Sequence, residues 1–580
     1  MTPYTPPVQD QLLAIRTNAG IAELAQSERF AAAEDDLVEA IVEGVGAFAA
    51  GEFAPLNRIG DTEGARLENG VVRLPDGFAE AYDHYVEQGW NAIAAPAGHG
   101  GQGLPFTLSC NVLENLGAAN MAFTLLPILS VGAIDALDHH GSDAQKAKYL
   151  PKLVSGEWSG TMNLTEPQAG SDVGALRTTA EPIDDGEHAG KYRIKGQKIY
   201  ITWGDHQLAR NIIHLVLART PDAPEGSRGI SLFVVPKYHV NADGSPGADN
   251  DVRCVSLEHK LGINASPTCV MSYGDNDECI GEMVGGEHGG LRAMFTMMNS
   301  ARINVGNQGV QIAERALQQA QHYARERIQS ARAGSDDRNP VAIVEHPDVR
   351  RMLIRMKSLT EGMRALLYYT AGQFDRGTLG NVAAARRAEV LVPLIKAWGT
   401  DTGVEVASIG IQVHGGMGFV EETGAAQHYR DARIAPIYEG TNGIQAADLV
   451  TRKLNMEGGA VVTALFEDMA RDCVDEPALF TLAGDCAAVA AWMREEASLD
   501  DRLAGSVPFT TMCAVAFAGW QLLRQKRAVD AGAAPTLREV KEVTTRYFID
   551  HVVPEAAGLK SAATDGASLL YKLGTSQLVG

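Results

Sequence analysis

The chain has 580 residues, a formal net charge of −22 and 45% apolar residues. That length predicts about three or four folding units and a large buried core. The acidic balance argues against a nucleic-acid-binding surface, so we expect no nucleic-acid partner.

The chain shows no sign of a membrane-targeting segment or of a cysteine-based site. The opening "MTPYTPPVQD" has no basic region followed by an apolar run, so we expect no signal peptide. The longest apolar run, near "MCAVAFAGW", is far short of a membrane span. We therefore expect a cytoplasmic protein that does not bind a membrane. The seven cysteines include no C-x-x-C pair, which predicts buried free thiols and no metal site.

The first segments of the chain have a helical pattern. Residues 1–34 are expected to form an N-terminal extension and residues 35–158 a helical domain. The glycine cluster "AGHGGQGLP" at 97–105 could be mistaken for a phosphate-binding loop. It does not lie between a strand and a helix, so we interpret it as a connection.

The pattern changes to short β-rich runs over residues 159–285. "YRIKGQKIYIT" at 192–202 alternates on both sides of Lys195-Gly196, which predicts two strands joined by a turn. "NIIHLVLAR", "GISLFVVP" and "TCVMSYG" follow between clusters of turn residues. These runs predict an antiparallel β domain.

Helical periodicity returns over residues 286–455, and a further helical domain is expected over residues 460–580. In the last domain, Thr536-x-x-Glu539 predicts a capping box at a helix start. In residues 286–455, apolar residues at helical spacing predict two successive helices, each with one apolar face. The first face comprises Val310, Ala313, Leu317, Ala320 and Ala324, and the second comprises Met352, Met356, Leu359, Met363 and Leu366.

One glutamate stands out in "PIYEGTNGIQ", residues 436–445. Glu439 precedes Asn442-x-x-Gln445, which is typical of a helix start. It could be a surface acid, a charge that stabilises the helix start, or a catalytic base.

Three stretches stand out together: "MNLTEPQAGSDVGALRTTA" (162–180), "GQKIYITWG" (196–204), and the segment from "IQVHGGMGF" to "YRDARIAPIYEGTNGIQ" (411–445). Each alone fits a turn, a flexible loop or a surface pair. Together, in this order, they resemble the acyl-CoA dehydrogenase family over residues 35–455. The resemblance implies a multidomain α+β fold with an N-terminal helical domain, a central antiparallel β domain and a C-terminal four-helix domain, here with an extra C-terminal helical domain.

The resemblance also implies a reaction. An FAD-dependent enzyme would convert an acyl-CoA thioester to the 2-enoyl-CoA, with a base removing the α-proton and flavin N5 taking the β-hydride. "EFAPLNRIGDTEG", "ERIQSAR" and the final domain resemble a large bacterial branch that processes a sulfur-containing short acyl-CoA, 3-methylmercaptopropionyl-CoA, during dimethylsulfoniopropionate breakdown. A short-chain acyl-CoA is the second substrate that the resemblance suggests. A medium- or long-chain dehydrogenase of β-oxidation, an acyl-CoA oxidase and a non-catalytic acyl-CoA-binding protein are the alternatives.

The family's catalytic base corresponds to Glu439. A minority of relatives place the base on an earlier helix, directly before an arginine, and that position here is Ala301. An alanine cannot accept a proton, so the resemblance favours Glu439. The substrate-binding positions that it implies are Ser171, Asn299, Arg302 and Tyr438.

The cofactor-binding positions that the resemblance implies fall in five groups. Tyr200 replaces a stacking tryptophan of many relatives, and Gln329-Ser330 replaces a usual Thr-Phe pair, so the adenosine contacts depart from the family pattern. The complete set comprises Leu164 and Thr165 near the flavin ring, Gly170 and Ser171 in the phosphate-side loop, Tyr200 and Thr202 in the next strand, Arg327, Gln412, Gly415 and Gly416 toward the diphosphate, and Thr441 beside the base.

The family pattern also implies partners. Electron-transfer flavoprotein would accept the electrons. The loop from Gln412 to Gly416 resembles one that receives the cofactor of a neighbouring subunit. The extra domain would occupy the surface on which dimers pair, so we expect a homodimer, with a tetramer as the alternative.

Overall fold

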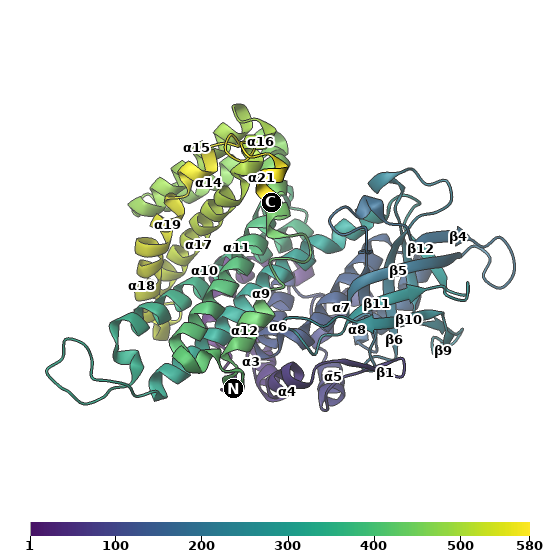
Figure 1. The fold of residues 1–580 in the computed structure, drawn as a ribbon, viewed down its shortest axis with the longest axis horizontal. Helices are drawn as coiled ribbons and strands as arrows, with labels where there is room; N and C mark the ends of the chain where they lie inside the picture. Colours follow the sequence, from purple (N-terminus) through teal and green to yellow (C-terminus); the bar gives the residue numbers. More distant parts are fainter. Residues whose placement is uncertain (1) are drawn as a thin grey trace. The chain divides into compact units, whose positions relative to one another are not determined.

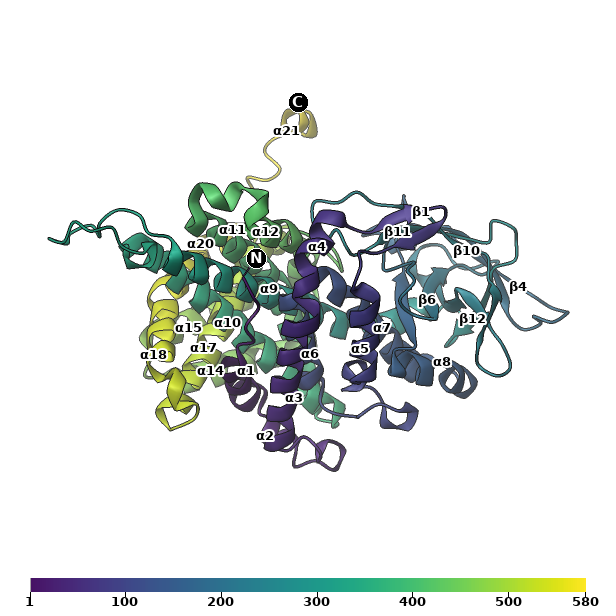
Figure 2. The same ribbon diagram turned by 90° about the horizontal axis from the view of Figure 1, so that it is seen from below.

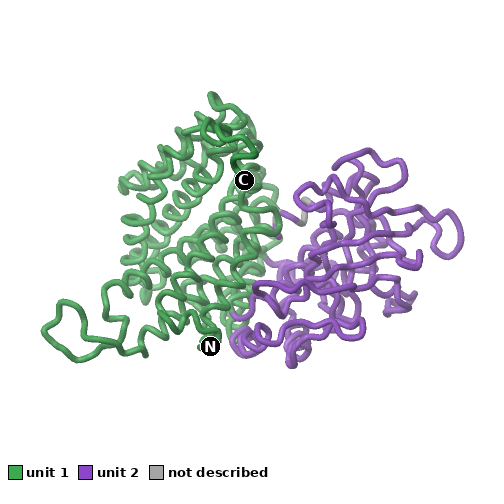
Figure 3. Tube along the Cα trace, viewed as in Figure 1, with its two compact units in different colours: residues 1–47, 105–118, 302–580 green, residues 48–104, 119–301 purple. Residues whose placement is uncertain are grey.

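The computed structural model describes residues 2–580, without the side chains of residues 295–297 and 299. Two compact units share the chain, one of residues 1–47, 105–118 and 302–580 and the other of residues 48–104 and 119–301 (Figure 3). The segment predicted as the N-terminal helical domain therefore contributes helices to both units. The multidomain α+β fold is confirmed.

The unit of residues 48–104 and 119–301 is built around a β-sheet (Figure 1). Helices α7 and α8 pack against one face of this sheet through buried apolar residues such as Leu137, Leu150 and Leu215. A second apolar core, which includes Ile194 and Phe233, fills the other face. The helices of this unit are α4 (Pro55–Glu63), α5 (Phe78–Glu87), α7 (Met121–His140) and α8 (Asp143–Ser155).

The sheet runs in the order β10-β11-β5-β12-β7-β6-β3, with β4 paired to β5. Its described pairs are antiparallel except β3 and β6, which run parallel. The prediction of an antiparallel β domain is thus confirmed, except that β3 and β6 run parallel. The strands are β3 (Trp158–Asn163), β4 (Thr179–Pro182), β5 (Tyr192–Thr202), β6 (Asn211–Ala218), β7 (Ser231–Pro236), β10 (Val252–Leu257), β11 (Thr268–Tyr273) and β12 (Ile280–Val284), beside a separate pair, β8 (Tyr238–Val240) and β9 (Pro246–Asp249).

Strand β5 corrects one expectation. The turn predicted at Lys195-Gly196 is wrong, because residues 192–202 form a single strand. Gly196 is needed there for close packing, since a Cβ on it would lie 2.5 Å from the hydroxyl oxygen of Thr178. A glycine in a strand interior often marks such a close approach.

A small hairpin in the N-terminal segment was missed. β1 (Arg66–Glu68) pairs with β2 (Val71–Arg73) around Asn69-Gly70. Both turn residues have positive φ, 52° and 77°, as the favoured two-residue hairpin turn requires. The Asn-Gly pair was the available signal.

The other unit is helical. The apolar faces predicted for two of its helices are confirmed, because Val310, Leu317, Met356 and Leu366 are buried in α9 and α10. Its first helices are α1 (Val8–Ala14), α2 (Ile21–Leu24), α3 (Asp35–Phe48), α6 (Phe106–Ala119), α9 (Gly290–Glu326, which begins in the sheet unit), α10 (Pro347–Thr378), α11 (Val382–His414), α12 (Ala425–Ala432) and α13 (Asn442–Thr451).

The added C-terminal segment is helical, as predicted, and α17 packs against α10, α11 and α13. Figure 2 shows α17 beside α10. The capping box at Thr536 is wrong. A short 3₁₀ turn covers Pro535–Leu537, and the helix begins at Arg538 without a side-chain cap. The helices are α14 (Ala460–Asp472), α15 (Pro477–Glu495), α16 (Leu499–Ala504), α17 (Ser506–Asp530), α18 (Arg538–Tyr547), α19 (Val553–Ala557), α20 (Lys560–Thr564) and α21 (Thr575–Val579).

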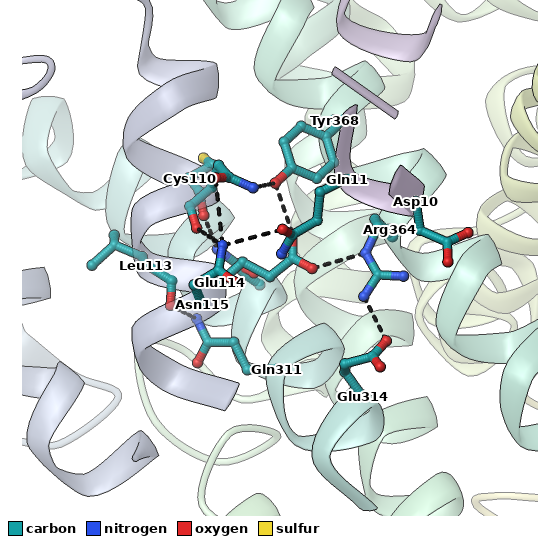
Figure 4. A network of polar contacts seen from close by, with 12 residues as sticks. Asp10, Gln11, Cys110, Leu113, Glu114, Asn115, Gln311, Glu314, Arg364 and Tyr368 are labelled. Carbon is teal, nitrogen blue, oxygen red and sulfur yellow. Dashed lines mark hydrogen bonds and ion pairs between the residues drawn. The ribbon is translucent and has the colours of Figure 1, made fainter. Parts of the chain in front are cut away.

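A buried polar network ties these helices together (Figure 4). The Arg364 guanidinium on α10 donates to Glu114 of α6 and to Glu314 of α9, each at 2.8 Å. All three side chains are buried. Lys541 of α18 lies 2.8 Å from the Asp10 carboxylate, so the N-terminal extension and the added domain share a buried ion pair. A buried charge left without its partner is strongly destabilising, which makes these contacts specific.

Two helices are apolar and long enough to cross a membrane, α7 and α17. In both, 83% of the apolar window is buried inside the protein, as in the core helices of soluble proteins. The seven cysteines are buried free thiols, as predicted.

Candidate active site

The Glu439 carboxylate stands on a tight turn between α12 and α13. Its backbone has φ 55°, and the following Gly440 has φ 83°. A non-glycine residue in this left-handed region is uncommon and costs about 1–3 kcal/mol, and such strain concentrates at functional sites. Thr441 then caps α13, because its hydroxyl oxygen accepts from the Ile444 N–H at 3.3 Å.

A buried lysine holds this turn from α11. The Lys396 side chain is fully buried. Its Nζ donates to the Gly440 carbonyl oxygen at 2.7 Å and to the Asn442 Oδ1 at 2.9 Å. The backbone carbonyl next to Glu439 is therefore fixed to a helix rather than to solvent.

Asn442 completes the anchor. Its Nδ2 donates to the Ala397 carbonyl and to the Thr400 hydroxyl, both at 3.0 Å. One amide thus links the start of α13 to one turn of α11. A side chain whose donors and acceptor are all engaged holds a single orientation, which positions the residues before it.

Two positive charges influence the half-buried Glu439. Burial raises the pKa of Glu439 above its usual range, and Arg302 and Lys396 oppose that rise. Burial lowers the pKa of Lys396 to about 8, although the nearby carboxylates of Glu439 and Asp401 act to raise it. A carboxylate that is raised in pKa and still accompanied by cations is suited to accept a proton near neutral pH.

Arg302 lies against the same turn. Its Nη2 is 3.8 Å from the position that a Cβ on Gly440 would take. Burial lowers the pKa of Arg302, and its buried Nε has no hydrogen-bond partner among the residues that the structure describes. An unsatisfied guanidinium N–H beside a candidate base is a ready donor for an anionic or carbonyl group of a ligand.

The remaining predicted substrate residues differ in what the structure describes. The Tyr438 hydroxyl donates to Gln308 of α9. This bond orients the ring directly before Glu439. The side chain of Asn299 lies outside the described residues, so its predicted role is untested.

In the sheet unit, the predicted flavin-side residues follow strand β3. The Ile199 N–H donates to the Thr165 carbonyl at 2.9 Å, which joins the loop after β3 to strand β5. Lys198, fully buried, donates to the Leu164 carbonyl at 3.1 Å and to Glu166 at 2.8 Å. Glu166 also accepts from the Arg177 and Thr178 backbone N–H groups at 2.7 and 3.0 Å.

This ion pair is chemically constrained. The pKa of Glu166 falls to about 2, with Lys198 and the hydrogen bonds outweighing burial, and burial lowers the pKa of Lys198 to about 8. Both groups are charged at neutral pH. The pair fixes the backbone of Leu164 and Thr165.

Tyr200 presents its ring outward. It is 59% exposed, although aromatic side chains usually bury their rings. Its backbone has φ 59°, a second strained position among the predicted site residues. Gly170 and Ser171 are also exposed, and a Cβ on Gly170 would meet nothing within 4 Å. Thr202 is half-buried at the end of β5. An exposed aromatic face suits a planar ligand.

In the helical unit, three of the predicted diphosphate residues lie at the end of α11, and Arg327 directly follows α9. Gly415 has φ 60° and ψ −141°, a combination open essentially to glycine alone. Apart from their chain neighbours, no described residue has an atom within 4 Å of the position that a Cβ on Gly415 or Gly416 would take. The side chains of Gln412 and Arg327 are exposed. This backbone is accessible to a large polar group.

Four family profiles match successive parts of the chain. They are the acyl-CoA dehydrogenase N-terminal domain over residues 36–157, the middle domain over 161–275, the C-terminal domain over 288–454, and an acetyl-CoA dehydrogenase C-terminal-like domain over 476–573. The chain belongs to the acyl-CoA dehydrogenase family.

Individual relatives agree with this assignment. The acyl-CoA dehydrogenase chain is 48% identical to 3-methylmercaptopropionyl-CoA dehydrogenase of Ruegeria pomeroyi, covering 98% of this chain and 99% of that protein. It is 41% identical to a butyryl-CoA dehydrogenase of Syntrophomonas wolfei over 70% of this chain and 68% of that one. A crystal structure of acyl-CoA dehydrogenase complexed with FAD from Bacillus anthracis has the same fold, with a TM-score of 0.75, 21% identity and coverage of 94% and 90%.

Several residues that hold the site of this acyl-CoA dehydrogenase were not anticipated. Lys396, Asn442, Glu166 and Lys198 position predicted residues within their own units, as described above. The available signal was a lysine in an apolar run, "LVPLIKAWG", and another at an inward strand position. The predicted residues fall into a group on or next to α9, α11 and α13 and a group that follows β3 or lies on β5.

Proposed function

We propose that this enzyme dehydrogenates a short acyl-CoA at the α,β bond, with Glu439 as the base and FAD as the cofactor. The observation that carries the proposal is the Glu439 turn. It combines a strained, half-buried carboxylate of raised pKa with two neighbouring cations and a buried anchor on α11.

The residues present fit FAD. The exposed Tyr200 ring offers a stacking face, and Thr165 and Ser171 offer polar groups in the segment after β3. The open backbone at Gly415 and Gly416 suits a diphosphate. Leu164, Gly170, Thr202, Arg327, Gln412 and Thr441 complete the set that we propose holds the cofactor. When bound, FAD accepts the β-hydrogen with its electron pair.

The chain's own residues supply the acid–base chemistry. Glu439 takes the proton from the α-carbon, and the electron pair of that C–H bond forms the new double bond as the β-hydride leaves. The Glu439 backbone N–H donates to the thioester oxygen, where negative charge develops. Arg302 and Tyr438 orient the acyl-CoA. Bound substrate displaces water and keeps the carboxylate basic.

We propose 3-methylmercaptopropionyl-CoA as the preferred substrate. Support comes from 48% identity over nearly the whole length to a relative named for that substrate. The match to a butyryl-CoA dehydrogenase makes a short straight acyl-CoA the second candidate. Both candidates are short, and a medium- or long-chain acyl-CoA is the outcome that the experiment below distinguishes.

We also propose a cytoplasmic homodimer that passes electrons to electron-transfer flavoprotein. Exposed apolar side chains beside Gly416 support assembly, because Met417 is 48% and Phe419 is 88% exposed. Apolar groups gathered at an exposed loop are typical of a protein interface. A partner subunit that binds there would place its cofactor against the Gln412–Gly416 loop of this subunit.

A graded series of acyl-CoAs tests the substrate. Purified holoenzyme is mixed anaerobically with 3-methylmercaptopropionyl-CoA, butyryl-CoA, octanoyl-CoA and palmitoyl-CoA, and bleaching of the flavin band is followed. We expect the highest kcat/KM with the thioether or butyryl substrate. A steady rise toward palmitoyl-CoA would overturn the short-chain assignment, and rapid reoxidation by oxygen would identify an oxidase.

A further inference from the structure

A buried glutamine on α9 contacts the turn that carries Glu439. The side chain of Gln308 is 1% exposed, and its Oε1 accepts a hydrogen bond from the Tyr438 hydroxyl. Tyr438 directly precedes Glu439, and all three residues belong to the helical unit. The Gln308 amide is therefore separated from the residue that we propose as the base by one tyrosine side chain.

A second residue of α9 contacts the other end of the same turn. The Arg302 Nη2 lies 3.8 Å from the position that a Cβ on Gly440 would take. Arg302 and Gln308 are six positions apart, which is about 9 Å along the helix axis. Since one contacts the residue after Glu439 and the other the residue before it, the two α9 side chains lie on either side of the base along the turn.

The electrostatic surroundings of Tyr438 place its phenol close to the Glu439 carboxylate. Burial raises the pKa of Tyr438, the bond to Gln308 opposes that rise, and the negative charge of Glu439 adds to it. The phenol is therefore protonated at neutral pH and acts as the donor in its bond to Gln308. The Gln308 amide oxygen is thereby occupied, and its NH₂ group stays available.

The Gln308 NH₂ group has no partner within the part of the chain that the structure describes. Its Nε2 is buried and makes no hydrogen bond there. A side-chain amide has two N–H donors, and a buried donor without an acceptor is costly. Buried polar groups in native proteins are nearly always paired, so a donor left free beside a proposed active site indicates an acceptor on a ligand.

The proposed substrate carries one acceptor that a fatty acyl group lacks. In 3-methylmercaptopropionyl-CoA, a thioether sulfur stands where pentanoyl-CoA, an acyl group of the same length, has its fourth carbon. A thioether sulfur accepts weak hydrogen bonds, whereas a methylene group accepts none. This sulfur is two bonds from the α-carbon, where Glu439 would remove the proton. The distinguishing atom is thus held near the base whenever the substrate is bound productively.

We infer that Gln308 is a specificity-determining residue, whose Nε2 donates to the thioether sulfur of the acyl group. Tyr438 holds the amide by its oxygen, so that the NH₂ group faces away from the phenol and is free for the substrate. A methylene at the same place would leave the buried donor unpaired, which disfavours the hydrocarbon substrate. This inference rests on the proposed dehydrogenation of a short acyl-CoA at Glu439.

The ratio of kcat/KM for 3-methylmercaptopropionyl-CoA to that for pentanoyl-CoA tests the inference. The holoenzyme is mixed anaerobically with each substrate, and flavin reduction is followed. Sulfur also changes the intrinsic reactivity of the β-carbon, so the informative quantity is how the ratio differs between wild type and Gln308→Leu. We expect the ratio to fall about two- to tenfold, as loss of one hydrogen bond implies. The change should lie mainly in KM for the thioether substrate, because the bond forms already in the ground state.

Gln311→Leu is the matched control. Gln311 is a fully buried glutamine one turn later on α9, and its Nε2 donates to the Leu113 carbonyl of α6 at 2.9 Å, so its loss should leave the ratio unchanged. Tyr438→Phe releases the amide and keeps the ring, so an intermediate fall is expected even if Gln308→Leu is unstable. An unchanged ratio in both site variants, or an equal fall in Gln311→Leu, would overturn the inference. A wild type that oxidises neither substrate would instead contradict the proposed function.

Discussion

The ammonium group of Lys396 donates a 2.7 Å hydrogen bond to the carbonyl oxygen of Gly440, the residue directly after Glu439. Its positive charge also lowers the pKa of Glu439 against the effect of burial. One buried side chain therefore anchors the turn and tunes the carboxylate that we propose as the base. This coupling makes its effect on catalysis measurable through pH.

Replacing Lys396 with methionine should shift the pH dependence of the reaction. The lysine charge favours the Glu439 carboxylate, so its loss raises the pKa of Glu439, and less carboxylate is present at a given acidic pH. The acid limb of the kcat/KM profile should therefore move to higher pH. Stopped-flow flavin reduction between about pH 5 and 9 measures this shift.

Lys541→Met is the matched control for that prediction. Lys541 is also a buried lysine with charged partners, Asp10 and Glu361, but it lies on α18. Its loss should lower stability and leave the acid limb in place. If both variants shift the limb equally, or if neither does, Lys396 does not tune Glu439.

Replacing Lys198 with methionine should destabilise the sheet unit and its hold on FAD. The substitution leaves Glu166 charged and buried, and breaking a buried pair in this way costs about 3–5 kcal/mol. The Leu164 carbonyl also loses its donor. We expect a lower Tm and faster release of FAD in a flavin-fluorescence thermal scan.

The control for Lys198→Met is Lys195→Met, three residues earlier on the same strand. Lys195 pairs with Asp277, and both side chains are more than 60% exposed. Exposed pairs contribute at most about 1 kcal/mol, so Lys195→Met should change Tm and FAD release little. A wild-type Tm in Lys198→Met would contradict the structural role given to the buried pair.

Phe419→Asp should weaken subunit association. Phe419 is 88% exposed beside the glycines that we propose approach a partner's cofactor. A carboxylate in an apolar interface is unfavourable, so the dimer should dissociate at higher protein concentration and retain less FAD. Sedimentation velocity with parallel flavin absorbance measures both. Val474→Asp, at an apolar residue of the added domain that is 72% exposed, should leave assembly intact. A monomeric wild type with full activity would refute the shared site.

The fold could be predicted largely because local patterns and global architecture agree. Apolar spacing located α9 and α10, and alternating runs located the sheet. The prediction of a turn at Gly196 was wrong, because a glycine that permits close packing against Thr178 has the same sequence signature as one that permits a turn. The prediction of a capping box at Thr536 was wrong, because Pro535 begins a 3₁₀ turn and the helix starts only at Arg538.

The site was predictable only in part. Glu439 stands in a motif that can be read directly, whereas the strain at its backbone and the Lys396 anchor depend on packing between α11 and the turn. Lys396 lies 43 positions before Glu439 in the chain, and spacing alone cannot show that their partners meet. Buried lysines in apolar runs are the signal that would have indicated such anchors.

The most direct test of the whole account is flavin reduction by Glu439→Gln, mixed anaerobically with acyl-CoA in a stopped-flow instrument. The variant keeps the size and most hydrogen bonds of the side chain but cannot accept the α-proton. FAD content and substrate binding should survive, while flavin reduction should fall about 10²–10⁴-fold, the loss typical of a general base. Glu422→Gln, at an exposed glutamate of the neighbouring loop, should react like the wild type. Near-normal bleaching in Glu439→Gln would contradict the account, because Ala301 cannot serve as a base and no proton acceptor would remain in the proposed mechanism.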